Sequence, residues 1–165
     1  MARIELVGKE RAPLLARRYY ERGDPGPIAA ALANVPELME PMLSFVNTVL
    51  GPTSLDPRLK EIVILRVSSV NGCHYCTEIH TRVARRLRFS PPELAALRGE
   101  APAPEGWTAK ERALFSFSEA ISTRPEAAVD LLQPLFQEAE IVELVTLASA
   151  TVLLNRFATA LGLPT

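Results

Sequence analysis

The stretch that decides the fold is residues 57–87, which read PRLKEIVILRVSSVNGCHYCTEIHTRVARRL. Asp56 and Pro57 place an N-cap residue before a proline at the first helical position, which predicts a helix over about 57–70. This helix is apolar on most sides, so we expect it near the centre of a helical bundle. Gly72 then ends it, because glycine adopts the left-handed conformation that closes many helices.

A second helix is expected over about 73–87, with almost no loop before it. Two helices joined so closely are expected to fold back on each other as an antiparallel pair. Glu61 lies 11 residues before Gly72, and His80 lies 8 residues after it. At about 1.5 Å of rise per residue, the two positions differ in axial height by only about 4.5 Å. The sequence therefore predicts a contact between the Glu61 carboxylate and the His80 imidazole.

The rest of the chain also indicates helices. No segment alternates cleanly between apolar and polar residues over six positions, so the predicted fold class is all-α, with about seven to eight helices around the central antiparallel hairpin. Proline and glycine mark a turn at 24–27. The stretch 99–106 is too short to separate independent units, so we expect residues 1–165 to form a single domain. The further helices are expected at about 14–20, 36–50, 91–98, 109–122, 127–132 and 138–161.

The composition argues against several classes of protein. The 165 residues carry a formal net charge of −1, whereas a dedicated nucleic-acid binder needs a basic excess. The best apolar run, 61–70, is interrupted by Arg66 and falls short of the roughly 18 residues that a membrane helix needs. The charged start, Met-Ala-Arg-Ile-Glu, is unlike a signal peptide. We therefore expect a cytoplasmic protein with no nucleic-acid or membrane partner, and with a core that folds without disulfides or metal.

Cys73 and Cys76 are the only cysteines, and they form a single C-x-x-C motif. A disulfide between them closes a ring too short to join distant parts of the fold. Both share one stripe of the predicted helix with His80, at spacings of three and four residues. Cys73 comes at the helix N-terminus, where unpaired N–H groups favour a thiolate, and His80 can take up or return a proton. This pattern is typical of a reactive dithiol.

Glu61 completes the candidate site. A carboxylate against an imidazole fixes the imidazole tautomer, as the orienting acid of a catalytic triad does. We therefore predict a proton-transfer chain Glu61–His80–Cys76, which needs no cofactor and no metal. Two other interpretations stay open. One is zinc bound by Cys73, Cys76, His80 and Glu61, and the other is a relative without redox chemistry, either a decarboxylase-type lyase or a structural oligomer.

The spaced residues resemble the core signature of the AhpD-like alkylhydroperoxidases, in the carboxymuconolactone decarboxylase superfamily: Glu61-(x11)-Cys73-His74-Tyr75-Cys76-(x3)-His80. The resemblance covers about residues 55–90, and more loosely a late segment with Asn155 and Arg156. These two polar residues interrupt an apolar helix. We interpret them either as a buried polar contact at a subunit interface or as an arginine that reaches out to water.

This resemblance implies an all-helical fold, assembly into trimers or hexamers, and a cysteine pair that reduces peroxides or exchanges disulfides. It implies that Cys76 attacks the peroxide, that Cys73 resolves the product, and that Glu61 and His80 relay protons. The substrate would be a small hydroperoxide or disulfide. The reductant would be a protein dithiol or a lipoyl-type donor.

One position departs from the best-known members, which carry a histidine immediately before the second cysteine. Here that residue is Tyr75, and the helical period turns His74 away from the cysteine stripe. A general thiol–disulfide oxidoreductase without strong peroxidase activity is therefore the alternative function. The helix N-terminus favours Cys73 as the more acidic thiol, whereas His80 and the resemblance favour Cys76 as the attacking one.

Overall fold

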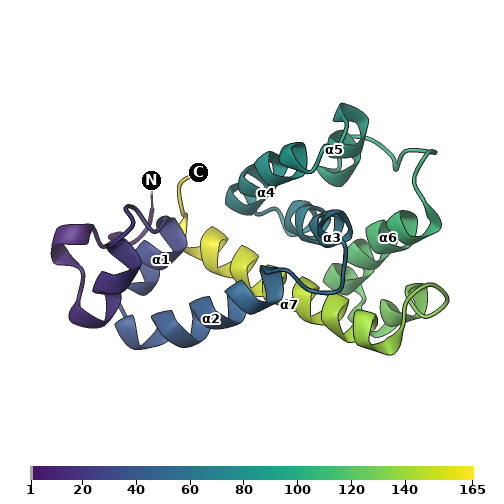
Figure 1. Ribbon diagram of the computed structural model, residues 1–165. Helices are drawn as coiled ribbons and strands as arrows, with labels where there is room; N and C mark the ends of the chain where they lie inside the picture. The colour runs from purple at the N-terminus through teal and green to yellow at the C-terminus, as the bar shows by residue number, and fades with distance from the viewer. Residues whose placement is uncertain (1) are drawn as a thin grey trace.

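Helix α3 (Pro57–Val70) lies at the centre of the computed structural model, which describes residues 2–165. It packs against α4 (His74–Arg86), α5 (Pro91–Leu97), α6 (Ala109–Thr123) and α7 (Glu138–Leu161). Figure 1 shows α3 between α4 and α6, with α7 passing below α3. Every regular element within the described range is a helix, so the predicted all-α class is confirmed.

The N-terminal part of the chain packs beside this centre. Helix α1 (Pro27–Leu32) packs against α2 (Met39–Leu50), and α2 packs along α7. The two ends of the chain meet near α1 in Figure 1, where the Arg3 N–H donates to the Leu161 carbonyl at 2.8 Å. Short 3-10 helices complete the chain: η1 (Lys9–Arg11), η2 (Leu14–Tyr20), η3 (Pro36–Leu38), η4 (Pro125–Ala127) and η5 (Val129–Leu131).

The start and the composition of α3 explain its central place. Asp56 Oδ1 accepts the Arg58 N–H at 2.7 Å, and Pro57 takes the first helical position, as the sequence predicts. A helix that is buried on most sides packs inside a bundle. The buried residues of α3 are Lys60, Glu61, Ile62, Val63, Ile64, Leu65, Val67 and Ser68.

The turn after α3 sets the direction of α4. Gly72 has a φ of +66°, which is the left-handed conformation that glycine adopts without strain. The Gly72 N–H donates to the Ser69 carbonyl at 3.0 Å, and the Cys73 N–H donates to the Ser68 carbonyl at 2.9 Å. This pair of bonds is the Schellman closure of a helix. Helix α4 begins at the next residue and returns along α3, so the predicted antiparallel hairpin is confirmed.

Two differences from the sequence prediction concern α1 and α2. The chain forms helix α1 at Pro27–Leu32, directly after the turn predicted at 24–27, in a stretch for which the sequence analysis predicts no helix. Proline at the first position and the alanines that follow favour this helix. The segment expected as one helix over 36–50 is a 3-10 turn followed by an α-helix from Met39. Pro41 thereby falls in the first α-helical turn, where backbone N–H groups have no partner within the helix.

Two further segments form 3-10 turns instead of the expected α-helices. At 14–20, Leu14 and Leu15 are exposed, so the segment buries too little apolar surface to stabilise an α-helix. At 127–132, the chain divides into η4 and η5. Pro125 and Pro134 bound this stretch and leave too few residues for a stable α-helix.

Helix α7 corrects another prediction. Its 24 residues are apolar enough, by length and composition, to cross a membrane. The expectation that no apolar segment reaches that length is therefore wrong. That expectation counted only unbroken runs of apolar residues, whereas the mean hydropathy of a helix stays high when a few threonine, serine or asparagine residues interrupt the run. Such a helix is weak evidence for a membrane span, because core helices also meet this criterion, and α7 packs against α2, α3, α4 and α6.

Candidate active site

The two cysteines meet at the N-terminus of α4. Cys73 is the N-cap residue, and its Sγ accepts a hydrogen bond from the Cys76 backbone N–H at 3.3 Å. The Sγ atoms of Cys73 and Cys76 lie 2.6 Å apart, and both residues are free thiols. A disulfide requires about 2.05 Å between the sulfurs, so the pair needs little movement to become oxidised.

This contact gives the two thiols different pKa values. Hydrogen bonding from the Cys76 thiol lowers the pKa of Cys73 to about 6, although burial opposes the shift, and the Cys76 backbone N–H adds to it. The same hydrogen bond, together with burial, raises the pKa of Cys76. At neutral pH the reduced pair therefore carries one negative charge, on Cys73, and keeps one proton, on Cys76.

The dithiol is almost completely enclosed. Cys73 is 0% exposed and Cys76 is 6% exposed, so Cys76 is the sulfur nearer to solvent. Apolar surroundings strengthen the hydrogen bonds that reach the sulfurs, because they exclude competing water. The surrounding side chains come from the N-terminal segment, α1, α4, α7 and the C-terminal turn: Leu6, Ile28, Ala31, Tyr75, Phe157, Ala158, Leu161 and Leu163.

Glu61 of α3 and His80 of α4 make the contact that the hairpin register predicts. The Glu61 Oε1 and His80 Nδ1 atoms are 2.9 Å apart, and the Glu61 side chain is 5% exposed. In the tautomer in which Nδ1–H donates to the Glu61 carboxylate, Nε2 carries the free lone pair of the imidazole. This arrangement can accept and return a proton at Nε2.

The second link of the predicted chain is not made. Over residues 2–165, the hydrogen bonds of His80 do not include one to Cys76. The two residues are one helical turn apart on α4, at the separation of about 5–6 Å between Cβ atoms that this spacing gives. The structure thus brings together Cys73 with Cys76 and Glu61 with His80, as two adjacent pairs.

Asn155 of α7 joins the site, although the sequence analysis assigns it no role there. It is 1% exposed; its Nδ2 donates to Ser68 Oγ at 3.0 Å, and its Oδ1 accepts from Asn71 Nδ2 at 3.2 Å. Asn155 adds to the lowering of the Cys73 pKa, after Cys76, and it opposes the rise of the Cys76 pKa. Asn155 therefore makes a buried polar contact within the chain itself. The signal in the sequence is a lone amide among the apolar residues of a long helix.

Tyr75 and His74 lie as the helical period predicts. His74 is exposed to solvent, whereas Tyr75 is half-buried against the cysteine cluster. Burial raises the pKa of Tyr75, and the neighbouring Cys76, Cys73 and Asp24 raise it further. The side chain beside the sulfurs is thus a neutral phenol at neutral pH. His74 is exposed, so it does not supply an imidazole beside the sulfurs.

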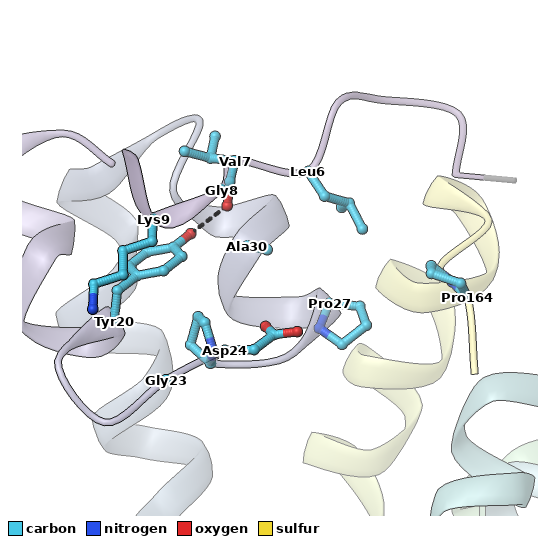
Figure 2. Close-up of a pocket in the computed structure, with 11 residues that line it drawn as sticks. Leu6, Val7, Gly8, Lys9, Tyr20, Gly23, Asp24, Pro27, Ala30 and Pro164 are labelled. Atoms are coloured by element: carbon cyan, nitrogen blue, oxygen red, sulfur yellow. Dashed lines mark hydrogen bonds between the residues drawn. The ribbon is translucent and has the colours of Figure 1, made fainter. Parts of the chain in front are cut away.

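A cavity of about 460 Å³ borders the cluster around the dithiol. Figure 2 shows it between the N-terminal segment, α1 and the C-terminal turn, with Asp24 between Pro27 and Tyr20. Leu6 lines this cavity and also packs against the cluster that holds both cysteines. The Tyr20 hydroxyl donates to the Val7 carbonyl at 2.7 Å and fixes one wall. The cavity and the cluster around the sulfurs thus share the Leu6 side chain.

Zinc binding finds no support in the geometry. Within the part of the chain that the structure describes, no group of three or more His, Cys, Asp or Glu side chains is arranged to hold a metal ion. The four side chains instead contact one another in two pairs, Cys73 with Cys76 and Glu61 with His80.

Comparison with known proteins gives the family. The model of the carboxymuconolactone decarboxylase family matches residues 36–119, just over half of the chain. The uncharacterized protein YdfG of Bacillus subtilis is 25% identical over 115 residues, which cover 67% of this chain and 78% of YdfG.

Solved structures agree on the fold. The Agrobacterium tumefaciens protein ATU0492, a candidate AhpD antioxidant-defence protein of unknown function, is 25% identical, with a TM-score of 0.71 over 82% of this chain and 96% of that one. The debrominase Bmp8 is 22% identical, with a TM-score of 0.78 over 96% of this chain and 89% of Bmp8. A Bmp8 variant with a cysteine replaced by alanine has been solved with 2,3,4-tribromopyrrole. The chain belongs to the carboxymuconolactone decarboxylase family and has an AhpD-like fold.

Proposed function

We propose that this protein is a dithiol oxidoreductase that reduces small hydroperoxides, with Cys73 and Cys76 cycling between a dithiol and a disulfide. The observation that carries the proposal is the 2.6 Å contact between two free thiols, and the lowered pKa of Cys73 supports it. A reactive dithiol needs both properties. The thiolate is the nucleophile, and a second sulfur must lie close enough to resolve its oxidised form.

The proposed reaction needs only the two cysteines and an external reductant. One thiolate attacks a peroxide oxygen, the O–O bond breaks, and the sulfur becomes a sulfenic acid while the leaving alkoxide takes up a proton. The second sulfur then attacks the sulfenic sulfur, which forms the disulfide and releases water. A protein dithiol or lipoyl-type donor reopens the disulfide by thiol–disulfide exchange and is itself oxidised.

Glu61 and His80 are the proposed proton relay. His80 is held at Nδ1 by Glu61, which leaves Nε2 for proton transfer, and it lies one helical turn from Cys76 on α4. Proton transfer to the leaving alkoxide, through His80 or through one water, lowers the barrier to O–O cleavage. The near-complete burial of Glu61 keeps the pair in a low-dielectric surrounding, where its hydrogen bond is stronger.

We assign the attack to Cys76. It is the more exposed sulfur, and it lies one helical turn from His80. Cys73 carries the charge of the resting pair and, at 2.6 Å, can take the Cys76 proton as the peroxide approaches. The low pKa of Cys73 supports the opposite order, and serine variants of the two cysteines distinguish the two orders.

The same dithiol supports a second function, the reduction of protein or small-molecule disulfides. Tyr75 favours this function, because the position before the second cysteine carries no additional imidazole to move protons. Bmp8, a debrominase with the same fold, adds brominated pyrroles as a third class of substrate to test.

We further propose that the protein works in the cytoplasm as a homo-oligomer, a trimer or hexamer. Large apolar side chains stay exposed on α2 and α7, among them Phe45 at 45%, Val142 at 66% and Leu153 at 46%. Exposed apolar side chains that gather on neighbouring helices are typical of surfaces that another chain covers.

The test is stopped-flow consumption of hydrogen peroxide or cumene hydroperoxide by the reduced protein, followed by mass spectrometry of the Cys73–Cys76 peptide. We expect one equivalent to be consumed per chain, with loss of two hydrogens and no free thiol. The double variant with both cysteines replaced by alanine is the matched control and should consume none. A wild type whose thiols survive the peroxide but exchange with a disulfide substrate would favour the second function. Activity that a chelator abolishes would contradict both.

A further inference from the structure

Asn155 is an exceptional residue on the buried face of α7. The neighbours on this face are apolar or, like Thr151, bonded back to the helix itself, with the Thr151 hydroxyl donating to the Leu147 carbonyl at 2.8 Å. The Asn155 amide instead bonds away from its own helix, to Ser68 in the last turn of α3 and to Asn71, the C-cap of α3. A buried amide is retained only where partners satisfy it, so its partners indicate what it does.

Those partners belong to the turn from which Cys73 extends. Ser68 accepts the Asn155 Nδ2 donor through its hydroxyl, and its own carbonyl accepts the Cys73 N–H. Asn71, the C-cap of α3, donates one amide to Asn155 Oδ1 at 3.2 Å and to the Val67 carbonyl at 2.9 Å. Asn155 thus links α7 to the two residues that close α3 just before the cysteine.

The amide has one donor left for the sulfurs. An asparagine carries two N–H donors, and Ser68 takes one of them. The largest influences on the pKa of Cys73 are the hydrogen bond from Cys76, which lowers it, and burial, which raises it, with no cation among the causes. Thr159, one turn later on α7, and Asn155 act after these to lower the pKa of Cys73, and Asn155 acts in the same direction on Cys76. The charge of the resting pair therefore depends on how the α3–α4 turn places Cys73 against Cys76.

We propose that Asn155 is a positioning residue of the dithiol, which braces the α3–α4 turn through Ser68 and Asn71 and so holds Cys73 at the N-terminus of α4. This inference rests on the proposed dithiol function, but it concerns a property of the thiols that can be measured without any substrate.

Several other titratable groups lie near the sulfurs, so the test must keep their influence on the thiol pKa constant. Tyr75 of α4 faces both cysteines, and Asp24 acts on Tyr75 from the loop before α1. His80 and Glu61 lie one turn further along the hairpin. Arg156, next to Asn155, is exposed and donates to Asn71 Oδ1 at 3.4 Å. The variants below leave all of these groups in place.

The first experiment is the pH titration of the thiolate ultraviolet absorbance of the reduced protein. Asn155→Leu removes both donors at similar volume, so the turn that presents Cys73 loses its brace, and we expect the midpoint to rise by up to about one pH unit, less than for loss of the Cys76 thiol. Thr151→Val is the matched control, one turn earlier on the same buried face, and should leave the midpoint unchanged. The titration midpoint is a better readout than a reaction rate. A thiolate with a higher pKa is intrinsically more nucleophilic, which partly offsets the smaller thiolate fraction in a rate measurement.

The second experiment is the redox equilibrium of the pair against glutathione at about pH 7. A rise of about one unit in the thiolate midpoint, from about 6 to about 7, shifts this equilibrium about fivefold towards the disulfide, because the reduced state loses stabilisation. Asn155→Gln keeps an amide on a longer side chain and should fall between Asn155→Leu and the wild type. Such partial rescue is not expected of a residue that only fills space.

Ser68→Ala keeps the test valid if Asn155→Leu does not fold. It removes one anchor of the amide without changing α7, and we expect a smaller shift of the midpoint in the same direction. Midpoints equal to the wild type in both Ser68→Ala and every folded Asn155 variant would overturn the proposal. A shift in Thr151→Val as large as in Asn155→Leu would also overturn it, because it would trace the effect to packing of α7.

The outcomes separate this inference from the proposed function. If the wild type consumes no peroxide while Asn155→Leu shifts the midpoint, the positioning role stands and the peroxidase function fails. If the wild type consumes peroxide and Asn155→Leu titrates like it, only the positioning role fails.

Discussion

Replacing Cys76 by alanine tests how the Cys73 thiolate is stabilised. The leading cause of the low Cys73 pKa is the hydrogen bond from the Cys76 thiol, across 2.6 Å. A hydrogen bond to a charged group contributes about 1.5–3 kcal/mol, and one pKa unit corresponds to about 1.36 kcal/mol. Cys76→Ala should therefore raise the Cys73 pKa from about 6 by about one to two units. Cys76→Ser keeps an O–H donor and is the matched control.

The change is large enough to measure directly. With a pKa of about 6, roughly 90% of Cys73 is thiolate at about pH 7, and the fraction falls as the pH drops through 6. In Cys76→Ala the thiolate fraction at the same pH should fall to between about 50% and about 10%. Thiolate absorbance against pH, checked by the midpoint of iodoacetamide labelling, gives both values. If Cys76→Ala titrates near 6 like Cys76→Ser, the helix N-terminus sets the acidity and the thiol contact does not.

The remaining predictions concern turnover, the relay and stability. Cys76→Ser should abolish peroxide turnover, while Cys73→Ser should consume one equivalent and stop as a sulfenic acid, detected by dimedone labelling; the reverse result would make Cys73 the attacking sulfur. Glu61→Gln and His80→Ala should each slow the attack by about a hundredfold in stopped flow. The double variant should be little slower than the slower single variant, since the two residues act as a unit. If the two rate losses multiply in the double variant, the residues act separately. Asp56→Ala removes the N-cap of α3 and should lower the free energy of unfolding by about 1 kcal/mol in a denaturant titration, whereas Ser54→Ala should change it little. Light scattering at micromolar concentration should give a trimer or hexamer, and a monomer would contradict the proposed assembly.

Local sequence signals predicted much of the fold. Asp56 and Pro57 start α3 as predicted, and the helices expected at 91–98 and 109–122 begin at capping boxes, Ser90 with Glu93 and Thr108 with Glu111, in which each side chain bonds to the backbone N–H of the other residue. These signals act within one turn of the chain, where the residue that caps a helix and the N–H groups that it satisfies are sequence neighbours. That residues 1–165 form a single domain stays a prediction.

The mispredicted segments are those whose conformation depends on what they bury. The sequence 14–20 has the composition of a helix, yet Leu14 is 78% exposed and the segment adopts a 3-10 turn. Helix α1 is only six residues long, and four of these, Ala29 to Leu32, are buried. Tertiary contact therefore stabilises one short segment and not the other, and propensity does not distinguish them.

The candidate site also combines contacts that the sequence predicts with contacts that it does not. Glu61 and His80 are 19 residues apart, and the short turn at Gly72 leaves one way for their helices to pair, so the rise per residue was enough to predict their contact. Asn155 is 84 residues from Asn71, and the chain between them passes through the stretch where the sequence prediction fails. A thiolate enclosed by apolar side chains is unfavourable unless donors reach it. The local hairpin supplies the reacting sulfurs and the carboxylate–imidazole pair, and the place of Cys73 at the helix N-terminus was enough to predict that it is the more acidic thiol. The hydrogen bond from Cys76, which is the leading cause of the low Cys73 pKa, depends on how the two side chains pack, and the contacts of Asn155 depend on how α7 packs onto α3, so neither could be predicted from the sequence.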